Sequence, residues 1–467
     1  MLLTIEKLIY GGDGLARLPA ESSDENDRGR GKAVFIPFVL AGEKIEATLT
    51  EVKRGFARAR ADAIVEASPN RVQPPCAYYT RCGGCHYQHA NYDHQLEIKK
   101  EILRENLRRI AKLELQCEIQ VHPSPPWNYR NRSRLQVRTH PEFATGYFKF
   151  ASHELLPVET CPISSPLINR GIAALWQSGR ANKAVAGVHE IEFFANANDT
   201  LLMLEFVCAP EAHRADVRAW AENLREAMPE IASITAFREP QKGVQKLLLS
   251  IGTSELTYET QRTAYRVSAG AFFQTNRFLT DELVEIVIAG RSGDVALDLC
   301  AGVGLFSTTL ACNFRHIVSV ESSQTAANDL AYNLPVNGAT VRAEVAQYLG
   351  ISTARIGGET GTGGGSSAQR RNSAKKGRLE KNALPQAKLP KPDFVVVDPP
   401  RAGLGTSVAT ALASLGAPRL TYVSCDPSTL ARDLIPLHAA GYRIEEVHLV
   451  DLFPQTYHLE SIVKLVR

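Results

Sequence analysis

Apolar and polar residues alternate in several short runs within the first 65 residues of the chain. Thr4–Ile9, Lys32–Pro37 ("KAVFIP") and Glu43–Thr50 ("EKIEATLT") show the period of two that half-buried strands require. The stretch "YGGDG" at residues 10–14 contains the glycines that are typical of a tight turn. Short strands at this spacing predict a small β-barrel at the start of the chain.

A helical period replaces this alternation at residues 93–114, where Lys and Arg lie opposite an apolar face. The apolar positions are Ile98, Ile102, Leu103, Leu107 and Ile110. Residues 120–262 return to strand-like runs, among them Glu190–Phe194 and Thr200–Phe206. We therefore expect one amphipathic helix followed by a mixed α+β region.

Four short apolar runs follow from about residue 263, separated by segments that are long enough for helices. The runs are Val295–Leu299, Ile317–Val320, Phe394–Val397 and Leu420–Val423. This alternation predicts a doubly wound α/β domain with a parallel sheet. Residues 357–392 break the pattern, because they are rich first in Gly and Ser, then in Lys and Arg, and then in Pro. That composition predicts a disordered insertion between two strands.

Composition adds limits to this picture. The 467 residues suggest about three domains, and a net charge of +3 identifies no partner by itself. Charged residues interrupt the apolar start, which argues against a signal peptide, and no run is long enough to span a membrane. Nine cysteines, an odd number, favour metal binding or chemistry in a cytoplasmic protein over a disulfide framework.

The run "ALDLCAGVGLF" at residues 296–306 reads as a strand followed by a glycine turn that opens a helix. Gly302 and Gly304 allow a ligand to approach the backbone at the carboxyl edge of the sheet. Glu321 ends the next strand, where its carboxylate can accept hydrogen bonds from ribose hydroxyls, and Asp298 can face an amino group. The pattern favours S-adenosylmethionine over a nicotinamide cofactor, whose third glycine is missing. An ordinary turn with a solvated glutamate is the alternative.

"FVVVDPPR" at residues 394–401 places Asp398 at the end of a buried strand, before a proline pair that stiffens the backbone. The Asp-Pro-Pro sequence is typical of methyltransferases that act on planar nitrogenous groups. A plain strand-terminal turn is the alternative.

"VSCDPSTLARDL" at residues 423–434 ends another strand with Cys425. The thiol there is a candidate core residue, metal ligand or nucleophile. A helix that begins at Ser428 would favour its thiolate form.

Three more cysteines, Cys76, Cys82 and Cys85, are separated by five and two residues, and Cys161 follows much later before a proline. Four thiolates suit either tetrahedral zinc or a four-iron cluster, and their spacing leaves both open. The tighter cysteine run of radical enzymes is absent from the sequence. Cys117, Cys208 and Cys312 are interpreted as buried thiols.

Four motifs together resemble the RNA uracil-5-methyltransferases, including those that act on 23S ribosomal RNA. They are "SCDPSTLARDL", "DPPR", "FFQTN" at residues 272–276 and "DLFPQTYHLE" at residues 451–460. "IEKLIYGGDGLARL" with "GKAVFIPFVLAGEKIEATL" resembles a TRAM domain, which is an OB-like RNA-binding barrel. "CAYYTRCGGC" with the "CP" at residues 161–162 resembles the iron–sulfur ligand set of the family.

The resemblance implies a reaction and a set of site residues. The family transfers a methyl group from S-adenosylmethionine to carbon 5 of a uridine in ribosomal or transfer RNA. Cys425 corresponds to its nucleophile and Glu460 to its base, and Cys76, Cys82, Cys85 and Cys161 correspond to the ligands of a [4Fe-4S] cluster. The expected cofactor contacts are Gln274, Asp298, Cys300, Gly302, Gly304, Leu305, Glu321 and Asp398. This chain departs from the family pattern at Cys300 and Ala301, where an aromatic residue and a cysteine are usual, and at Leu305, where a polar residue is common.

RNA contacts are predicted from "YRNRSRLQVR" at residues 129–138, which interleaves arginines with aromatic residues. The candidates are Arg130, Arg132, Arg134 and Arg138 beside Tyr129, followed by Phe143, Tyr147, Phe148 and Lys149. The alternative is a β-strand with a solvated basic edge.

We therefore expect three domains. Residues 1–66 form the TRAM barrel, residues 67–92 and 120–262 a central α+β domain with the iron–sulfur site, and residues 93–119 and 263–467 a Rossmann-like class I methyltransferase domain. The expected partner is RNA, with ribosomal RNA ahead of transfer RNA, and we expect a monomer without membrane contact. A catalytically inactive RNA-binding or assembly protein is the alternative from another class. A cytosine-5 methyltransferase is a second alternative. It would have its nucleophile in a Pro-Cys motif after the strand that here ends in "DPPR", and that cysteine is absent from the sequence.

Overall fold

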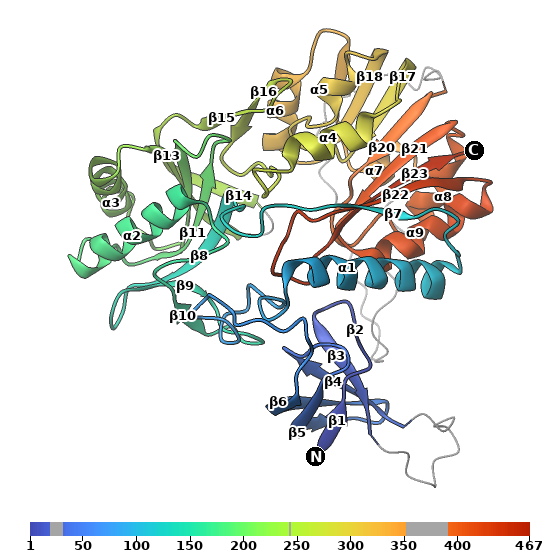
Figure 1. Cartoon of the computed structure of the whole chain (residues 1–467). Coiled ribbons are helices and arrows are strands. Elements are labelled where there is room, and N and C mark those ends of the chain that lie inside the picture. Colours follow the sequence, from blue (N-terminus) through green and yellow to red (C-terminus); the bar gives the residue numbers. More distant parts are fainter. Residues whose placement is uncertain (19–30, 242–243, 352–390) are drawn as a thin grey trace, which may run out of the picture.

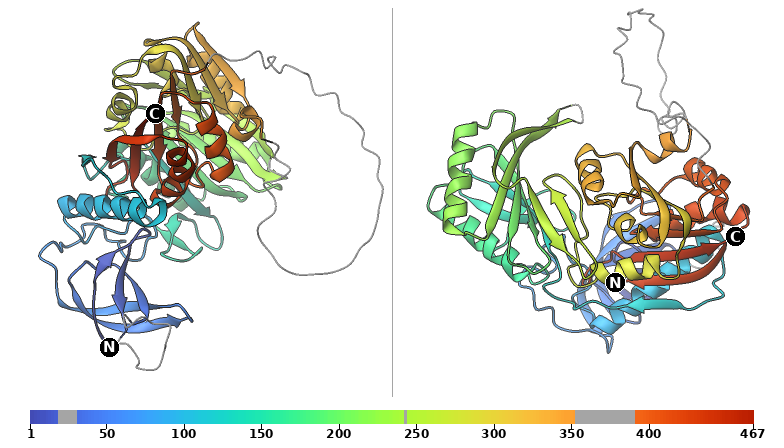
Figure 2. Two further views of the ribbon diagram at one scale, coloured as in Figure 1. Left: turned by 90° about the vertical axis from the view of Figure 1, so that its right-hand side faces the viewer. Right: turned by 90° about the horizontal axis from the view of Figure 1, so that it is seen from above.

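The computed structural model describes residues 1–18, 31–241, 244–351 and 391–467. Within these ranges the strands form three larger sheets and one hairpin. The sheet of the first residues lies below helix α1 (Tyr92–Asn106), and the other two large sheets lie side by side (Figures 1 and 2). The insertion expected at residues 357–392 falls outside the described residues except for its last two.

Six strands at the N-terminus curl into a barrel (Figure 1), which we call the N-terminal barrel. Alternation drives this fold, because Val34 and Ile36 of one strand are fully buried among the barrel residues while their neighbours are less so. The predicted strands at Lys32–Pro37 and Glu43–Thr50 are confirmed. In sheet order the strands are β1 (Leu2–Thr4), β5 (Lys44–Val52), β6 (Phe56–Glu66), β4 (Ala33–Pro37), β3 (Asp13–Arg17) and β2 (Lys7–Leu8).

Seven strands form the middle sheet, against which α2 (Pro166–Arg180) and α3 (Arg214–Ala227) pack. Its core includes Phe193, Phe206 and Trp220, each almost fully buried. In sheet order the strands are β10 (Leu155–Pro157), β9 (Ala144–Phe148), β8 (Arg132–Arg138), β11 (Val188–Ala195), β12 (Leu202–Cys208), β13 (Ile231–Gln241) and β14 (Val244–Gly252). The hairpin of β15 (Glu255–Glu259) and β16 (Ala264–Ser268) leads from this sheet to the next.

Eight strands form the C-terminal sheet, whose first five are parallel. In sheet order they are β19 (Gly338–Arg342), β18 (Phe314–Glu321), β17 (Gly293–Leu299), β20 (Phe394–Val397), β21 (Arg419–Ser424), β23 (Glu460–Val466), β22 (Arg443–Val450) and β7 (Ile119–His122). The four apolar runs of the sequence are thus confirmed as strands of one sheet. Because β7 pairs with β22, this sheet also takes in residues 120–122, which the sequence assigned to the middle domain.

The C-terminal sheet is buried on both faces, as a doubly wound fold requires. Ala296 and Val396 face a core that includes α4 (Thr280–Ile288) and α5 (Ser307–Leu310). Leu297 and Val397 face the opposite core with α1, α8 (Thr406–Ser414) and α9 (Pro427–Ala439). The remaining helices are a π-helical turn at Leu107–Ala111, α6 (Gln324–Asn333) and α7 (Val345–Tyr348).

In the part of the chain that the structure describes, no helix is both long and apolar enough to cross a membrane.

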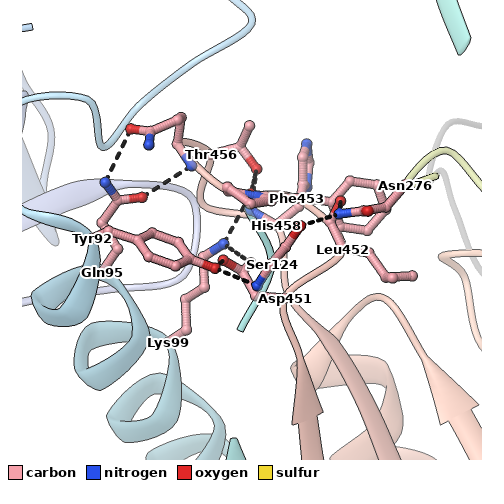
Figure 3. Close-up of polar contacts among 12 residues, drawn as sticks. Tyr92, Gln95, Lys99, Ser124, Asn276, Asp451, Leu452, Phe453, Thr456 and His458 are labelled. Carbon is pink, nitrogen blue, oxygen red and sulfur yellow. Dashed lines mark hydrogen bonds and ion pairs between the residues drawn. The ribbon is translucent and has the colours of Figure 1, made fainter. Parts of the chain in front are cut away.

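A buried ion pair joins α1 to the segment between β22 and β23, residues 451–459 (Figure 3). The Lys99 ammonium lies 2.6 Å from a carboxylate oxygen of Asp451, and both side chains are fully buried. Lys99 also donates to the carbonyl oxygen of Phe453 at 2.9 Å, and the Tyr92 hydroxyl donates to the other oxygen of Asp451 at 2.9 Å. Every charge in the group therefore has a close partner, which is what burial of an ion pair requires.

Further bonds hold the same segment along its length. Gln95 donates to the Gln455 side chain at 3.0 Å and accepts from its backbone at 3.0 Å. Asn276 donates to the carbonyl of Leu452 at 3.2 Å (Figure 3). The segment is thus attached both to α1 and to the "FFQTN" motif.

We expect Lys99→Met to lower the free energy of unfolding by about 3–5 kcal/mol, because Asp451 is then left buried without its cation. Urea unfolding followed by circular dichroism measures the loss. Lys100→Met, on the same helix but outside this ion pair, is the matched control. The double variant Lys99→Met, Asp451→Asn should lose less than the two single changes added together. Equal loss in Lys99→Met and Lys100→Met contradicts the anchoring role.

Candidate active site at the strand ends of the C-terminal sheet

Three neighbouring strands bring a thiol and two carboxyl groups together. β20 ends at Val397 just before Asp398, and β21 ends at Ser424 just before Cys425. β23 begins at Glu460 and runs antiparallel to β21, with Ser424 paired to Ser461. Continuing this register sets Cys425 opposite Glu460, and residues opposite each other in an antiparallel pair have neighbouring side chains. The sheet therefore places the predicted nucleophile beside the predicted base.

The turn after Cys425 forms because Asp426 caps the following helix. Its carboxylate accepts from the backbone of Ser428 at 2.9 Å and of Thr429 at 3.0 Å, and Pro427 occupies the first helical position. These amides are satisfied by Asp426. The expected stabilisation of the Cys425 thiolate by this helix stays a prediction.

Burial raises the pKa of Cys425 to about 12, and the negative charges of Glu460 and Asp398 contribute, while Arg401 opposes them. Cys425 is therefore a neutral thiol at neutral pH. Ionisation of Cys425 therefore requires a change in its surroundings.

The two carboxyl groups are shifted in the same direction. Burial raises the pKa of Glu460 well above its ordinary value, with a further rise from Asp398 and an opposing effect of Arg401. Burial also raises the pKa of Asp398 to about 7, with Asp298 adding to it. One oxygen of Glu460 is buried and has no hydrogen-bond partner among the described residues. The carboxylate of such a group is a stronger base than that of an exposed glutamate.

Sequence reasoning missed two residues of this site. Arg401 lies 3.3 Å from the ring of His458, and it is the cation that offsets the charge of both Cys425 and Glu460. Burial, followed by the charge of Arg401, lowers the pKa of His458 to about 2, so this imidazole is neutral. The signal was present in the motifs, because Arg401 ends "DPPR" and His458 lies within "YHLE".

The predicted cofactor residues gather at the carboxyl ends of β17 and β18. Asp298 is fully buried, accepts a hydrogen bond from Ser307, and keeps its second oxygen without a partner among the described residues. Burial raises the pKa of Asp298 to about 7. Gly302 has a φ of +57° and open space where a side chain would start, so its backbone is accessible to a ligand. Glu321 accepts from the Gly302 amide at 2.9 Å and so supports this turn.

Two of the predicted cofactor residues behave differently from the others. The Leu305 side chain is buried in the core with Val303 and Phe306, so only its backbone can face a ligand. Cys300 has a φ of +65°, and burial, followed by Asp398, raises its pKa. Cys300 therefore lies in a buried environment with several carboxyl groups nearby.

Gln274 lies in the segment 272–276 after β16, and its side chain is 8% exposed. Asn276 binds this segment to Leu452, and the backbone of Asn131 donates to Thr275 at 3.1 Å. Gln274 is thus held next to the segment that carries Glu460, although it lies far from it in sequence.

A second cluster lies in the middle domain, where Cys76, Cys82, Cys85 and Cys161 line one cavity of about 180 Å³. The pKa of Cys82 is raised to about 11 by burial, and the other cysteines contribute to the rise. Within the described ranges, no three His, Cys, Asp or Glu side chains could hold a metal ion in their present positions. The four thiols therefore surround a space and do not converge on a single point.

Arg130 also lines this cavity, and its Nε atom is buried without a partner in the described part of the chain. This arginine was predicted to contact RNA. Arg132 is ion-paired with Glu192 and Glu205 and donates to the carbonyl of Ala271 at 2.8 Å, so it is also engaged inside the protein. The predicted stripe of four arginines was therefore wrong for these two.

The outer part of the stripe is accessible. Arg134 and Arg138 are exposed on β8, although Arg134 pairs with Glu190 and Glu192. Phe148 is also exposed, whereas Phe143 packs against Trp176 and is only partly exposed. Of the three further thiols, Cys208 is buried as expected, Cys117 is half-buried and Cys312 is exposed.

Comparison with known proteins agrees with these features. The model of the tRNA (uracil-5-)-methyltransferase family matches residues 91–467, and the TRAM domain model matches residues 1–61. An uncharacterized RNA methyltransferase of Aquifex aeolicus is 30% identical over 99% of this chain and 97% of its own length. Another from Caldanaerobacter subterraneus is 31% identical over 94% of each chain.

A solved structure has the same fold. The Pyrococcus abyssi tRNA (uracil-54, C5)-methyltransferase, in complex with S-adenosyl-L-homocysteine, superposes with a TM-score of 0.69 at 24% identity and covers 100% of both chains. The N-terminal TRAM domain, the C-terminal α/β methyltransferase fold and the resemblance from the motifs are thereby confirmed. The chain belongs to the tRNA (uracil-5-)-methyltransferase family.

Proposed function

We propose that this protein transfers a methyl group from S-adenosylmethionine to carbon 5 of a uridine in RNA. Cys425 acts as the nucleophile and Glu460 as the base. The observation that carries the proposal is the placement of this thiol and this carboxyl group on facing strands, with Asp398 at the end of the next strand. Family membership supports the same reaction class.

The chemistry explains why both groups are needed. Carbon 5 of uracil is a poor nucleophile, but addition of the Cys425 sulfur to carbon 6 turns the ring into an enolate. Carbon 5 then takes the methyl group, which S-adenosylmethionine supplies as an electrophile. Glu460 removes the proton from carbon 5, and the bond between carbon 6 and sulfur breaks as the thiolate leaves. The target uridine has to be turned out of any stem to reach the thiol.

The residues around the thiol fit these proton movements. The raised pKa of Glu460 makes its carboxylate a better base for a carbon-bound proton than an exposed glutamate. Arg401 stabilises negative charge on both Cys425 and Glu460. As sulfur attacks, the Cys425 proton passes to the neighbouring carboxylate of Asp398, which leaves Glu460 free to take the carbon-5 proton.

The cofactor residues fit S-adenosylmethionine. The unpaired oxygen of Asp298 suits an ammonium group, and the open space at Gly302 suits close approach of a ligand to the backbone. We assign Asp298, Cys300, Glu321, Asp398 and Gln274 to this site. Gly302, Gly304 and the backbone of Leu305 complete the turn.

We propose that Cys76, Cys82, Cys85 and Cys161 hold a [4Fe-4S] cluster. The four thiols line one cavity, which supports a shared multi-atom group, and the resemblance to the family favours the cluster over zinc. Four thiolates also give Arg130 the anionic neighbour that its buried Nε lacks. Methyl transfer needs no electron, so the cluster has a structural role.

The substrate is RNA, and ribosomal RNA is our first choice because the resemblance associates a TRAM domain and an iron–sulfur site with that branch. Transfer RNA is the second candidate, because the matching family is described as acting on it. We propose a division into a barrel at residues 1–66, a central domain at 67–92 and 123–262, and a catalytic domain at 93–122 and 263–467, because β7 pairs with β22 and so moves residues 120–122 to the catalytic domain.

The reaction is tested with labelled S-adenosylmethionine and with ribosomal and transfer RNA from a strain that lacks the protein. We expect 5-methyluridine in one RNA pool, mapped by nucleoside analysis. Cys425→Ala should abolish the product, while Cys312→Ala, at an exposed thiol, should not. Glu460→Gln should slow turnover by about 10²–10⁴-fold and accumulate a covalent RNA adduct, because the carbon-5 proton then stays in place. Absence of 5-methyluridine from both pools refutes the proposal.

The raised pKa of Cys425 predicts slow alkylation that accelerates with pH. Only the thiolate reacts, so below a pKa of about 12 the rate should rise about tenfold per pH unit between pH 8 and pH 10. Glu460→Gln removes a negative charge and lowers this pKa, so its rate at pH 8 should be higher. Peptide mapping after iodoacetamide treatment measures the rate at each cysteine, with exposed Cys312 as an internal reference. A plateau near the ordinary thiol value of about 8.5 contradicts the burial argument.

Arg130→Met should reduce the iron and sulfide bound per chain, because it removes the cation beside the cysteine cavity. Arg138→Met, at an exposed position of the same strand region, is the matched control and should keep the wild-type content. Both are measured by elemental analysis after purification without air. A colourless, iron-free wild-type preparation under these conditions refutes the cluster itself.

A further inference from the structure

One residue of the N-terminal barrel reaches the turn that carries Cys425. Tyr10 lies in the turn between β2 and β3, at the end of the barrel that faces α1 (Figure 1). Its hydroxyl donates to the backbone carbonyl of Cys425 at 3.1 Å, across 415 positions of sequence. Its ring meets the ring of Tyr457 edge-on, with centroids 5.5 Å apart.

The barrel end that carries Tyr10 is firmly attached to the C-terminal domain. Leu8 and Leu40 are buried in the core formed by α1, α8 and α9. Lys7 is ion-paired with Glu105 of α1. These contacts between the barrel and the C-terminal domain hold the turn of Tyr10 in position.

Tyr10 thereby touches both segments that bear the reacting groups. One is the turn of Cys425, and the other is the segment 451–459, which leads into Glu460. Tyr457 continues the contact to His458, with ring centroids 4.1 Å apart, and His458 lies against Arg401. The burial of Tyr10 raises its pKa, so the phenol stays protonated and remains a donor at neutral pH.

We propose that Tyr10 is a positioning residue of the methyl-transfer site and is supplied by the N-terminal barrel. Its hydroxyl fixes the main chain of Cys425, and its ring fixes Tyr457, so that the thiol and the base keep their register. This inference rests on the proposed function. A small displacement of a nucleophile is costly, since a shift of about 1 Å can lower a rate by about 10²-fold. The docking of an RNA-binding barrel is thus part of the geometry of the reaction.

The test uses the full-length protein and transcripts of ribosomal and transfer RNA that contain 5-fluorouridine. Fluorine at carbon 5 cannot be removed as a proton, so the adduct between Cys425 and carbon 6 accumulates and its formation rate can be measured. At saturating RNA and S-adenosylmethionine, Tyr10→Phe should slow adduct formation about 3- to 10-fold, as expected for one lost hydrogen bond. The Kd for RNA, measured by filter binding, should be unchanged. Tyr10→Ala should be slower than Tyr10→Phe, because the contact to Tyr457 is lost as well.

Tyr442→Phe is the matched control. The Tyr442 hydroxyl also donates to a backbone carbonyl, that of Ala417, at 2.8 Å, but away from the site. This variant should lower Tm while the adduct rate stays at the wild-type value.

The outcomes separate the two proposals. A wild-type protein that forms no adduct with either RNA overturns the proposed function. A wild-type protein that forms the adduct, with Tyr10→Phe equally fast, overturns only the role of Tyr10. Weaker RNA binding with an unchanged adduct rate also overturns it, because Tyr10 would then be an RNA contact and not a positioning residue.

Discussion

A fully buried ion pair, Lys99 with Asp451, holds the segment on which the candidate site is built. Burial of two charges is costly, and the pair persists because Tyr92 and the carbonyl of Phe453 complete its hydrogen bonds. The segment 451–459 that it anchors leads from β22 into the first residue of β23, which is Glu460. Lys99 is the cation of α1 that pairs with this segment, through Asp451. The position of the base therefore depends on a helix more than 350 residues earlier in the chain.

The pKa values in the site are raised because several carboxyl groups lie buried close to one another. Asp298, Asp398 and Glu460 all have raised pKa values, and burial is the first cause for each. The same burial keeps Cys425, the proposed nucleophile, as a neutral thiol. The positive charge of Arg401 opposes the rise in pKa of Cys425 and Glu460. The site thus combines a neutral thiol, Cys425, with a buried carboxyl group of raised pKa, Glu460.

The three domains meet around this site. The barrel contributes Tyr10, the C-terminal domain contributes Tyr457, and His86 from the cysteine-rich segment packs edge-on against Tyr457 with centroids 4.6 Å apart. Gly12 explains the close approach, because a side chain there would lie 3.1 Å from His86. The N-terminal barrel and the cysteine-rich segment are thus packed directly against the segment that leads into Glu460.

Strands, caps and motifs could be predicted from the sequence because they depend on residues a few positions apart. The apolar runs became β17, β18, β20 and β21, and Asp426-Pro427 begins a helix. The partners of charged groups could not be predicted in this way. Arg132 begins a strand with the expected alternation and Arg130 lies just before it, yet packing turned Arg130 towards a cysteine cavity and Arg132 towards buried glutamates. The cap at Asp426 could be predicted, but the burial and the neighbouring charges that raise the pKa of Cys425 could not. The sequence by itself determined which residues can do the chemistry. Only the tertiary structure decided their ionisation and the contact of Tyr10, because burial and Coulomb energy depend on distances between atoms that the chain brings together from remote positions.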